Sequence, residues 1–267
     1  MQAKQEQIVT AAPARWTLMI CVLGNFQLLR AGQPVIVPLH GKAQAFLSTL
    51  ALRYRQPVRR EIILESLWPD TSSTLAGQSL NSLVYTLHKQ LGQHIGGALP
   101  VVHTNGYYRL NQESGITTDL AYFEALISKA EQWRHRGDAA AAMLTYTQAI
   151  SLYHGDLTCD SDLQASIERE RLRACYLNVL AWLADYHYER HEYATSLNYA
   201  HQLLLNDSCR EDAHRLVMRC YVRRNERAQA LRQYHLCASM LRAEFDTTPE
   251  PATLALFERI RLTPESI

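Results

Sequence analysis

The chain has 267 residues, of which 47% are hydrophobic and 20% are charged. This composition supports two folded domains of ordinary size and argues against wholesale disorder. The sequence contains no uncharged apolar run of about 18 residues, so we expect no membrane-spanning helix. The polar segment 1–14 lacks an apolar signal core, so we expect a cytoplasmic protein without a secretion signal.

The net charge of +1 conceals an asymmetry along the chain. Residues 1–111 carry ten Lys and Arg against four Asp and Glu, a formal charge of +6. Residues 112–267 carry seventeen against twenty-two, a formal charge of −5. A basic front part can attract a polyanion, whereas the rear part would repel one. Small domains also differ in charge by chance, so this asymmetry needs support from motifs.

The front part combines strand and helix patterns. Short apolar runs within residues 16–37, separated by Gly-rich and Pro-containing turns, predict a small antiparallel sheet. Three amphipathic helices are expected next, and Ile62, Ile63 and Leu67 should face inward on the second of them. The three helices are expected over about residues 42–54, 59–67 and 75–91.

A hairpin is predicted after the three helices. Two β-prone runs, 100–103 and 107–110, flank Thr104-Asn105-Gly106. Asn-Gly between such runs is a strong hairpin signal. The order of sheet, three helices and hairpin is that of a winged helix-turn-helix. We therefore expect a flexible tail over residues 1–15 and a winged-helix domain of mixed α and β structure over residues 16–111.

Residues 112–267 are predicted to form an all-α domain of tetratricopeptide-like repeats, so the fold class is mainly α. Segment 190–194 resembles segment 224–228, which lies 34 residues further on, and segment 136–140 resembles both. Thirty-four residues is the period of the tetratricopeptide repeat. In such repeats small residues let two antiparallel helices approach closely. The small residues expected to do this are Ala140, Ala194 and Ala228.

The helix expected over residues 75–91 carries the functional argument. At 100° per residue its leucines and Val84 form a core stripe, and polar side chains lie opposite them. Such side chains can contact base edges or phosphates from within a DNA major groove. A solvated helix face shows the same pattern, so this helix alone does not decide. The residues expected to face bases are Gln78, Asn81, Ser82, Tyr85 and Thr86.

Basic side chains around this helix favour double-stranded DNA as the partner. Each Lys or Arg that displaces counterions from phosphate adds affinity that is independent of base sequence. Taken singly, each is more often a solubilising charge, but they coincide with the +6 front part and the winged-helix order. The residues expected to contact phosphate or to form the wing are Lys42, Arg59, Arg60, His88, Lys89, Thr104, Asn105, Tyr107 and Arg109.

Short motifs spread along the chain carry a family resemblance. The front part contains Leu23-Gly24-Asn25-Phe26, Leu67-Trp68-Pro69-Asp70 and Asn105-Gly106-Tyr107-Tyr108-Arg109-Leu110. The rear part contains Thr118-Asp119-Leu120 and the closing segment 245–251. In this order they resemble the Streptomyces-type antibiotic regulatory protein family over about residues 16–261. The resemblance implies an OmpR-like winged helix followed by a bacterial transcriptional activator domain.

The resemblance also implies a function. Such a regulator binds direct repeats near a promoter in tandem and recruits RNA polymerase. A homodimer on DNA is a separate expectation. Its second and third helices form the helix-turn-helix, and the third reads the major groove. This sequence departs from the pattern, because family members usually carry arginine where Gln44, Thr86 and His88 stand. Fewer cations weaken phosphate anchoring and flatten its salt dependence.

Motifs for catalysis, cofactors and metals are missing from the sequence. The six cysteines form no C-x-x-C pair and are interpreted as reduced thiols. His187 and His191 are spaced to share a helix face, and Asp156, Asp160 and Asp162 cluster, but neither set completes a metal-site signature. The sequence therefore predicts no enzyme, no cofactor and no metal site.

Two functions remain open at this stage. The first is a sequence-specific DNA-binding activator. The second is a protein-interaction or adaptor module whose winged helix binds DNA weakly or not at all. The replaced arginines favour the second function, whereas the Asn-Gly-Tyr wing and the +6 front part favour the first.

Overall fold

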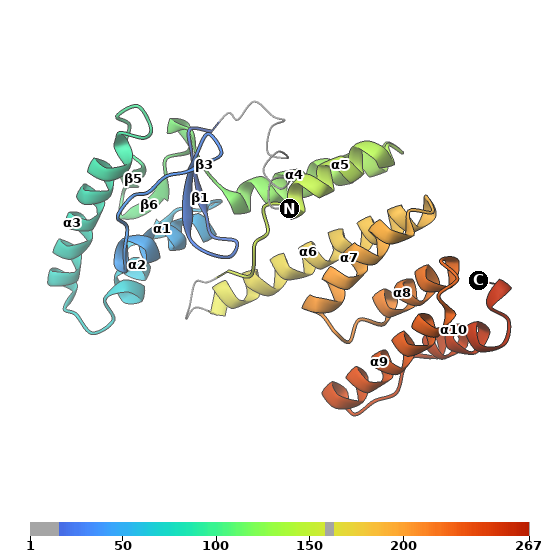
Figure 1. Ribbon diagram of the computed structural model, residues 1–267. Helices are drawn as coiled ribbons and strands as arrows, with labels where there is room; N and C mark the ends of the chain where they lie inside the picture. Colours follow the sequence, from blue (N-terminus) through green and yellow to red (C-terminus); the bar gives the residue numbers. More distant parts are fainter. Residues whose placement is uncertain (1–15, 158–162, 267) are drawn as a thin grey trace. The chain divides into compact units, whose positions relative to one another are not determined.

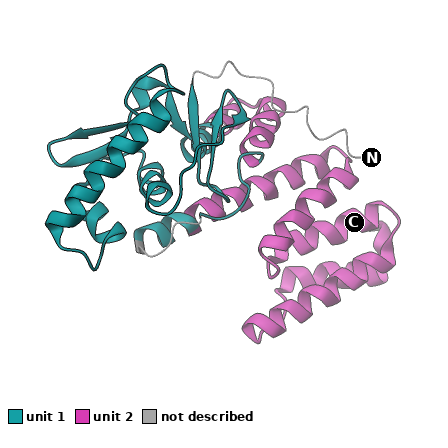
Figure 2. Ribbon diagram, turned by 60° about the vertical axis from the view of Figure 1, so that its left-hand side comes forward, with its two compact units in different colours: residues 1–128, 151–169 teal, residues 129–150, 170–267 magenta. Residues whose placement is uncertain are grey.

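The computed structural model describes residues 16–157 and 163–266. The chain divides into two compact units, residues 1–128 with 151–169 and residues 129–150 with 170–267 (Figure 2). No helix among the described residues is long and apolar enough to cross a membrane. The two units are defined by how closely their parts pack together and not by the predicted domain bounds. The domains predicted over residues 16–111 and 112–267 therefore remain a proposal.

Unit 1 contains a four-stranded sheet in the order β3-β2-β1-β7. Strands β1, β2 and β3 form the antiparallel meander expected from the sequence. Strand β7 was not predicted, and it pairs parallel with β1, with Leu18 opposite Ile116 and Ile20 opposite Thr118. All four residues of β1 are buried, which places this strand in the core. The strands span Leu18–Cys21 (β1), Gln27–Arg30 (β2), Gln33–Pro34 (β3) and Ile116–Thr118 (β7).

Asp119, the residue after β7, connects the start of helix α4 (Asp119–His135) to the end of β1. Its carboxylate accepts backbone N–H groups from Val22 at 2.9 Å, Leu23 at 2.8 Å and Leu120 at 2.8 Å. Burial raises the pKa of this carboxyl to about 6, although the three backbone hydrogen bonds act to lower it. A buried carboxylate that accepts several backbone N–H groups thus holds the end of β1 against the start of α4.

Three helices follow β3 in the order expected from the sequence. Their core side chains include Phe46, Leu50, Ile63 and Leu80, each at most 1% exposed. The inward orientation predicted for Ile62 was wrong, because this residue is 38% exposed. Adjacent helical positions differ by about 100°, so Ile63 takes the core position and Ile62 is turned away. The helices span Lys42–Leu52 (α1), Arg60–Leu67 (α2) and Ser73–Gly92 (α3).

A second sheet, in the order β4-β6-β5, contains the predicted hairpin. Asn105 (φ 52°) and Gly106 (φ 80°) both adopt left-handed backbone conformations, as a tight hairpin turn requires. Thr104 lies opposite Tyr107 across this turn, and Val58 of β4 pairs with Tyr108. The strands span Val58–Arg59 (β4), Val101–Thr104 (β5) and Tyr107–Leu110 (β6).

The rest of the described chain is helical after the short 3-10 helix η1 (Gln112–Ser114) and strand β7, apart from the final 3-10 helix η2 (Pro264–Ser266). Within unit 2, α7 packs on α8, α8 on α9 and α9 on α10. This confirms the predicted fold class, mainly α with a front part of mixed structure. The helices span Asp119–His135 (α4), Ala139–Ile150 (α5), Leu163–Glu189 (α6), Tyr193–Asn206 (α7), Glu211–Arg223 (α8), Arg227–Phe245 (α9) and Pro251–Leu262 (α10).

Three turns of unit 2 have the same backbone structure. Gly137, His191 and Asn225 end α4, α6 and α8 with φ of 78°, 62° and 63°. In each turn this residue donates its N–H three residues back, and the next residue donates five residues back. That pair of bonds is the Schellman arrangement of a helix end. The three predicted repeats therefore share the same turn between their two helices.

The small residues that let neighbouring helices pack closely are not the ones that were predicted. Ala140, Ala194 and Ala228 are exposed. The buried small residues lie two positions later, and Ala142, Ser196 and Ala230 are each 0% exposed. The Ser196 hydroxyl donates to the Ala184 carbonyl of the preceding helix at 2.8 Å. The repeat was aligned correctly, but the packing partner decides which of the first residues in each helix turns inward.

Candidate nucleic-acid interface

Helix α3 lies on the outer side of unit 1, beside β5 and β6 (Figure 1). One side of the helix is buried, with Leu80, Leu87 and Leu91 at 0% exposure. The opposite side is open, and Tyr85 is 72% exposed. The five residues predicted to face bases are all exposed on that side: Gln78, Asn81, Ser82, Tyr85 and Thr86.

Two of these side chains have internal hydrogen bonds. The Thr86 hydroxyl donates to the Ser82 carbonyl one turn earlier, at 2.9 Å. Asn81 Oδ1 accepts from Arg60 Nη1 at 3.3 Å. Gln78 and Tyr85 have no hydrogen-bond partner within the described ranges 16–157 and 163–266. The face therefore combines uncommitted polar groups with two whose orientation is fixed.

Most of the cations predicted to contact phosphate have partners within unit 1. Lys42 donates from Nζ to the Leu67 carbonyl at the end of α2 and lies 4.7 Å from the ring centre of Trp68. Arg59 pairs with Glu61 at 3.4 Å. The Lys42 contact joins α1 to the end of α2, whereas the Arg59 pair is local to the start of α2. Both cations are exposed, so both remain accessible to a ligand.

Two further predicted residues are also engaged. Arg109 lies 3.6 Å from the Glu113 carboxylate in an exposed pair, a geometry that contributes little to stability. His88 is turned toward the hairpin, with Nε2 3.1 Å from the Val101 carbonyl. Lys89, by contrast, is exposed and has no partner among the described residues. Lys89 is therefore the cation of α3 placed best for a phosphate contact.

The hairpin presents the predicted wing. Thr104, Asn105, Tyr107 and Arg109 are exposed, whereas Tyr108 is 2% exposed and faces the core. The ring of His103 stacks on Tyr108 with centroids 4.2 Å apart. This alternation lets the buried side of β6 hold the hairpin while the other side and the turn face outward.

Sequence reasoning missed the contacts made by Arg60 and Gly77. Arg60 was predicted to bind phosphate, but its guanidinium is turned inward, to the Gly77 carbonyl at 3.2 Å and the Tyr108 hydroxyl at 3.1 Å. The one available signal was a glycine inside a helix, which lowers helix stability by roughly 1 kcal/mol relative to alanine. A glycine inside a helix therefore indicates that another group approaches the helix closely at that position.

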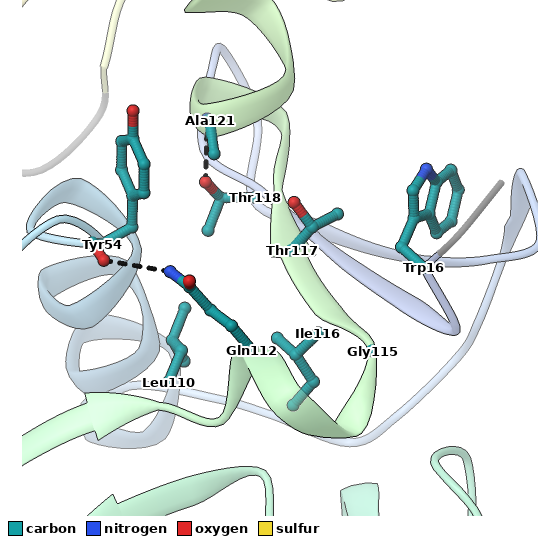
Figure 3. A pocket seen from close by; sticks show the side chains of 9 residues that line it. All are labelled: Trp16, Tyr54, Leu110, Gln112, Gly115, Ile116, Thr117, Thr118 and Ala121. Atoms are coloured by element: carbon teal, nitrogen blue, oxygen red, sulfur yellow. Dashed lines mark hydrogen bonds between the residues drawn. The ribbon is translucent and has the colours of Figure 1, made fainter. Parts of the chain in front are cut away.

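A pocket of about 290 Å³ lies elsewhere in unit 1 (Figure 3). Gln112 Nε2 donates to the Tyr54 carbonyl at 3.1 Å on one side, and Thr118 Oγ1 accepts the Ala121 N–H at 3.0 Å on another. Tyr54 is the ionisable residue among those that line it, and burial raises the pKa of its hydroxyl. Its lining therefore offers no acid–base pair for catalysis.

Candidate metal ligands do not come together in the described part of the chain. His187 Nδ1 lies 2.6 Å from Glu192 and His191 Nδ1 lies 2.8 Å from the Tyr193 hydroxyl, so each contacts its own partner. Asp156 accepts from the Tyr153 hydroxyl at 2.6 Å, while Asp160 lies outside the described residues. Asp162 and Cys159 lie outside them as well, and no disulfide links the cysteines that the structure describes.

The rear part of the chain matches a family profile described as the bacterial transcriptional activator domain, over residues 118–261. The match covers more than half of the chain. The chain belongs to this family. This membership confirms the resemblance found in the sequence to regulators that carry a bacterial transcriptional activator domain.

Two similar proteins also cover the front part of the chain. The regulatory protein AfsR of Streptomyces coelicolor is 24% identical over 240 residues, which is 90% of this chain and 24% of that protein. The chain thus spans about a quarter of the length of this curated relative. The structure of Mycobacterium tuberculosis EmbR in complex with a low affinity phosphopeptide is 21% identical, with a TM-score of 0.75. The alignment covers 92% of this chain and 65% of that chain, so the two share their fold.

Proposed function

We propose that this regulator binds DNA in a sequence-specific manner and activates transcription, with α3 in the major groove. The observation that carries the proposal is the exposed face of α3, where five polar side chains stand opposite a fully buried leucine stripe. A major groove admits one helix, and amide and hydroxyl groups can pair with base edges. Gln78, Asn81, Ser82, Tyr85 and Thr86 would face bases.

Phosphate contacts would come from α3 and the wing. Lys89 would bind phosphate directly, and Thr104, Asn105 and Tyr107 would approach the backbone or the minor groove from the hairpin turn. Lys42, Arg59 and Arg109 are exposed and would add positive charge, but each would have to share its cation with a present partner. His88 would contribute least, because its ring faces the Val101 carbonyl.

The family likeness suggests a promoter arrangement. We propose binding to direct repeats, with two copies of the chain on adjacent sites and contact to RNA polymerase through the helical repeats. The formal charge supports this division of roles, because residues 1–111 carry +6 and residues 112–267 carry −5. The acidic part would be repelled by DNA and left available to a protein partner.

A second candidate is an adaptor whose winged helix has lost most of its DNA affinity. The observation that favours it is the number of cations with internal partners: Lys42, Arg59, Arg60 and Arg109 are all engaged. With few free cations, each bound protein molecule would displace few counterions from the DNA. The two candidates therefore differ most in their salt dependence.

The test is a binding titration between about 50 and 200 mM salt. The full chain is mixed with labelled DNA fragments from upstream of its own gene and from unrelated sequence, and fluorescence anisotropy is recorded. The DNA-binding proposal expects saturation on one fragment, a falling affinity with salt and competition by that fragment alone. Folded protein that fails to bind at the lowest salt would reject the proposal and favour the adaptor.

A further inference from the structure

We propose that Arg60 is a positioning residue: it locks α3 to the wing and orients the Asn81 amide so that its NH₂ group faces DNA. This inference rests on the proposed function and deepens it, because it states which kind of base edge Asn81 reads. It also replaces the phosphate contact that the sequence suggested for Arg60.

Arg60 joins three elements of unit 1. Its backbone N–H donates to the Gly106 carbonyl in the hairpin turn at 2.8 Å. Its guanidinium donates from Nη1 to the Tyr108 hydroxyl on β6 at 3.1 Å and from Nη2 to the Gly77 carbonyl on α3 at 3.2 Å. One residue at the start of α2 therefore fixes the wing and α3 relative to each other. A planar guanidinium with five N–H donors is suited to such a junction.

Gly77 provides the space for this junction. A Cβ at position 77 would lie 2.6 Å from Arg60 Nη2, well inside contact distance, so any side chain there displaces the guanidinium. Gly77 is buried in the interior of α3, where alanine would be the better helix former. The chain thus tolerates a weaker helix at the position where Arg60 must approach.

The hydrogen bond to Asn81 sets the orientation of its amide. A guanidinium donates and cannot accept, so the Asn81 atom facing Arg60 Nη1 at 3.3 Å is Oδ1. The Nδ2 group is then directed away from Arg60, on the exposed face of α3. Acceptors in the major groove are purine N7, guanine O6 and thymine O4, whereas cytosine presents a donor. Asn81 is therefore set to read an acceptor and to reject cytosine.

The experiment compares Gly77→Ala, Arg60→Lys and Arg60→Ala with the control Arg59→Ala, which changes the neighbouring exposed cation. Each protein is titrated against a bound fragment and its single-base variants. For Gly77→Ala and Arg60→Lys we expect discrimination at the Asn81 position to fall by about fivefold or more, with affinity for unrelated DNA nearly unchanged. Gly77→Ala should remain folded, because the better helix propensity of alanine offsets part of the lost Arg60 contacts, and a cooperative thermal transition would separate positioning from a structural defect.

Two outcomes would overturn the inference. If Arg60 contacts phosphate, Arg60→Ala weakens binding to all sequences equally and Arg60→Lys restores it. If the amide is not oriented by Arg60, wild type does not disfavour cytosine and the variants keep its base preferences.

Hydrogen exchange in the absence of DNA provides an independent reading. Arg60→Ala should speed exchange in residues 73–92 and 101–110, and Arg59→Ala should not. Equal exchange in both variants would reject the junction itself. Failure of wild type to bind any fragment would reject the proposed function and the base contact, while the exchange result would still decide the junction.

Discussion

The turns of unit 2 and the exposed face of α3 use polar residues in opposite ways. Asp138 in the α4–α5 turn caps its helix through the Ala141 N–H at 2.9 Å, and Ser196, near the start of α7, donates to the Ala184 carbonyl. On α3, Gln78 and Tyr85 point outward without a partner in the described part of the chain. Polar groups with internal partners stabilise the fold. Polar groups that face solvent on a helix whose other side is buried are available for a ligand. Substitutions in the two sets should therefore have different consequences.

Among the residues with internal partners, the largest effect on the free energy of unfolding is expected at Asp119. Its pKa in the folded chain is about 6, whereas an unfolded aspartate titrates near 3.9. Between about pH 4 and 6 the folded chain binds more protons than the unfolded chain, so the free energy of unfolding falls as pH rises through this window. A difference of about two pKa units corresponds to about 3 kcal/mol.

Urea denaturation at pH 4, 5, 6 and 7 of wild type and Asp119→Asn measures this contribution. The variant cannot ionise, so subtracting its curve removes the other titrating groups. We expect wild type to lose up to about 3 kcal/mol relative to the variant between pH 4 and 7. A difference that does not change with pH would mean that the backbone hydrogen bonds offset the burial completely.

A smaller effect is expected for Ala230→Leu. Ala230 is 0% exposed and packs with Met218, Leu256 and Ile260, so a larger side chain must displace a filled core. Overpacking of this kind costs typically 1–3 kcal/mol. The matched control is Ala228→Leu, which changes an exposed alanine at the start of the same helix. Chemical denaturation should show a clear loss for the first and less than about 0.5 kcal/mol for the second; equal losses would contradict the assigned packing.

Gly137→Ala should have a smaller effect again. Gly137 has φ 78°, and a Cβ there would meet no atom within 4 Å, so the penalty comes from the backbone alone. A left-handed conformation costs a residue with a side chain roughly 1–2 kcal/mol. Thermal denaturation should therefore show a loss of about 1 kcal/mol. An unchanged melting temperature would show that this turn does not hold the left-handed conformation.

Local signals in the sequence predicted most of the fold. The hairpin followed from Asn105-Gly106, and the helices of both parts followed from their apolar periodicity. The pairing of β7 with β1 could not be predicted, because it joins residues about 98 positions apart, such as Leu18 and Ile116, through a strand of only three residues. The burial of Ala142 in place of Ala140 depends on which helix packs against it.

The candidate site divides in the same way. Exposure of Gln78, Asn81 and Tyr85 follows from helical periodicity alone, so the outward face of α3 could be predicted. The orientations of Arg60 and His88 could not, because their partners Tyr108 and Val101 are brought close only by tertiary folding. A cation near a proposed interface either contacts phosphate or stabilises its own fold, and its contacts within the protein distinguish the two.

The most direct test of the central claim compares Asn81→Ala with Lys89→Ala. Both residues are exposed, so neither change should alter stability by more than about 0.5 kcal/mol. Each variant is titrated with one bound fragment and its single-base variants over a salt series. The account predicts that Lys89→Ala weakens binding to every sequence and reduces the salt slope by about one, while Asn81→Ala relaxes preference at one position. Equal weakening across all sequences by Asn81→Ala would contradict base reading by α3.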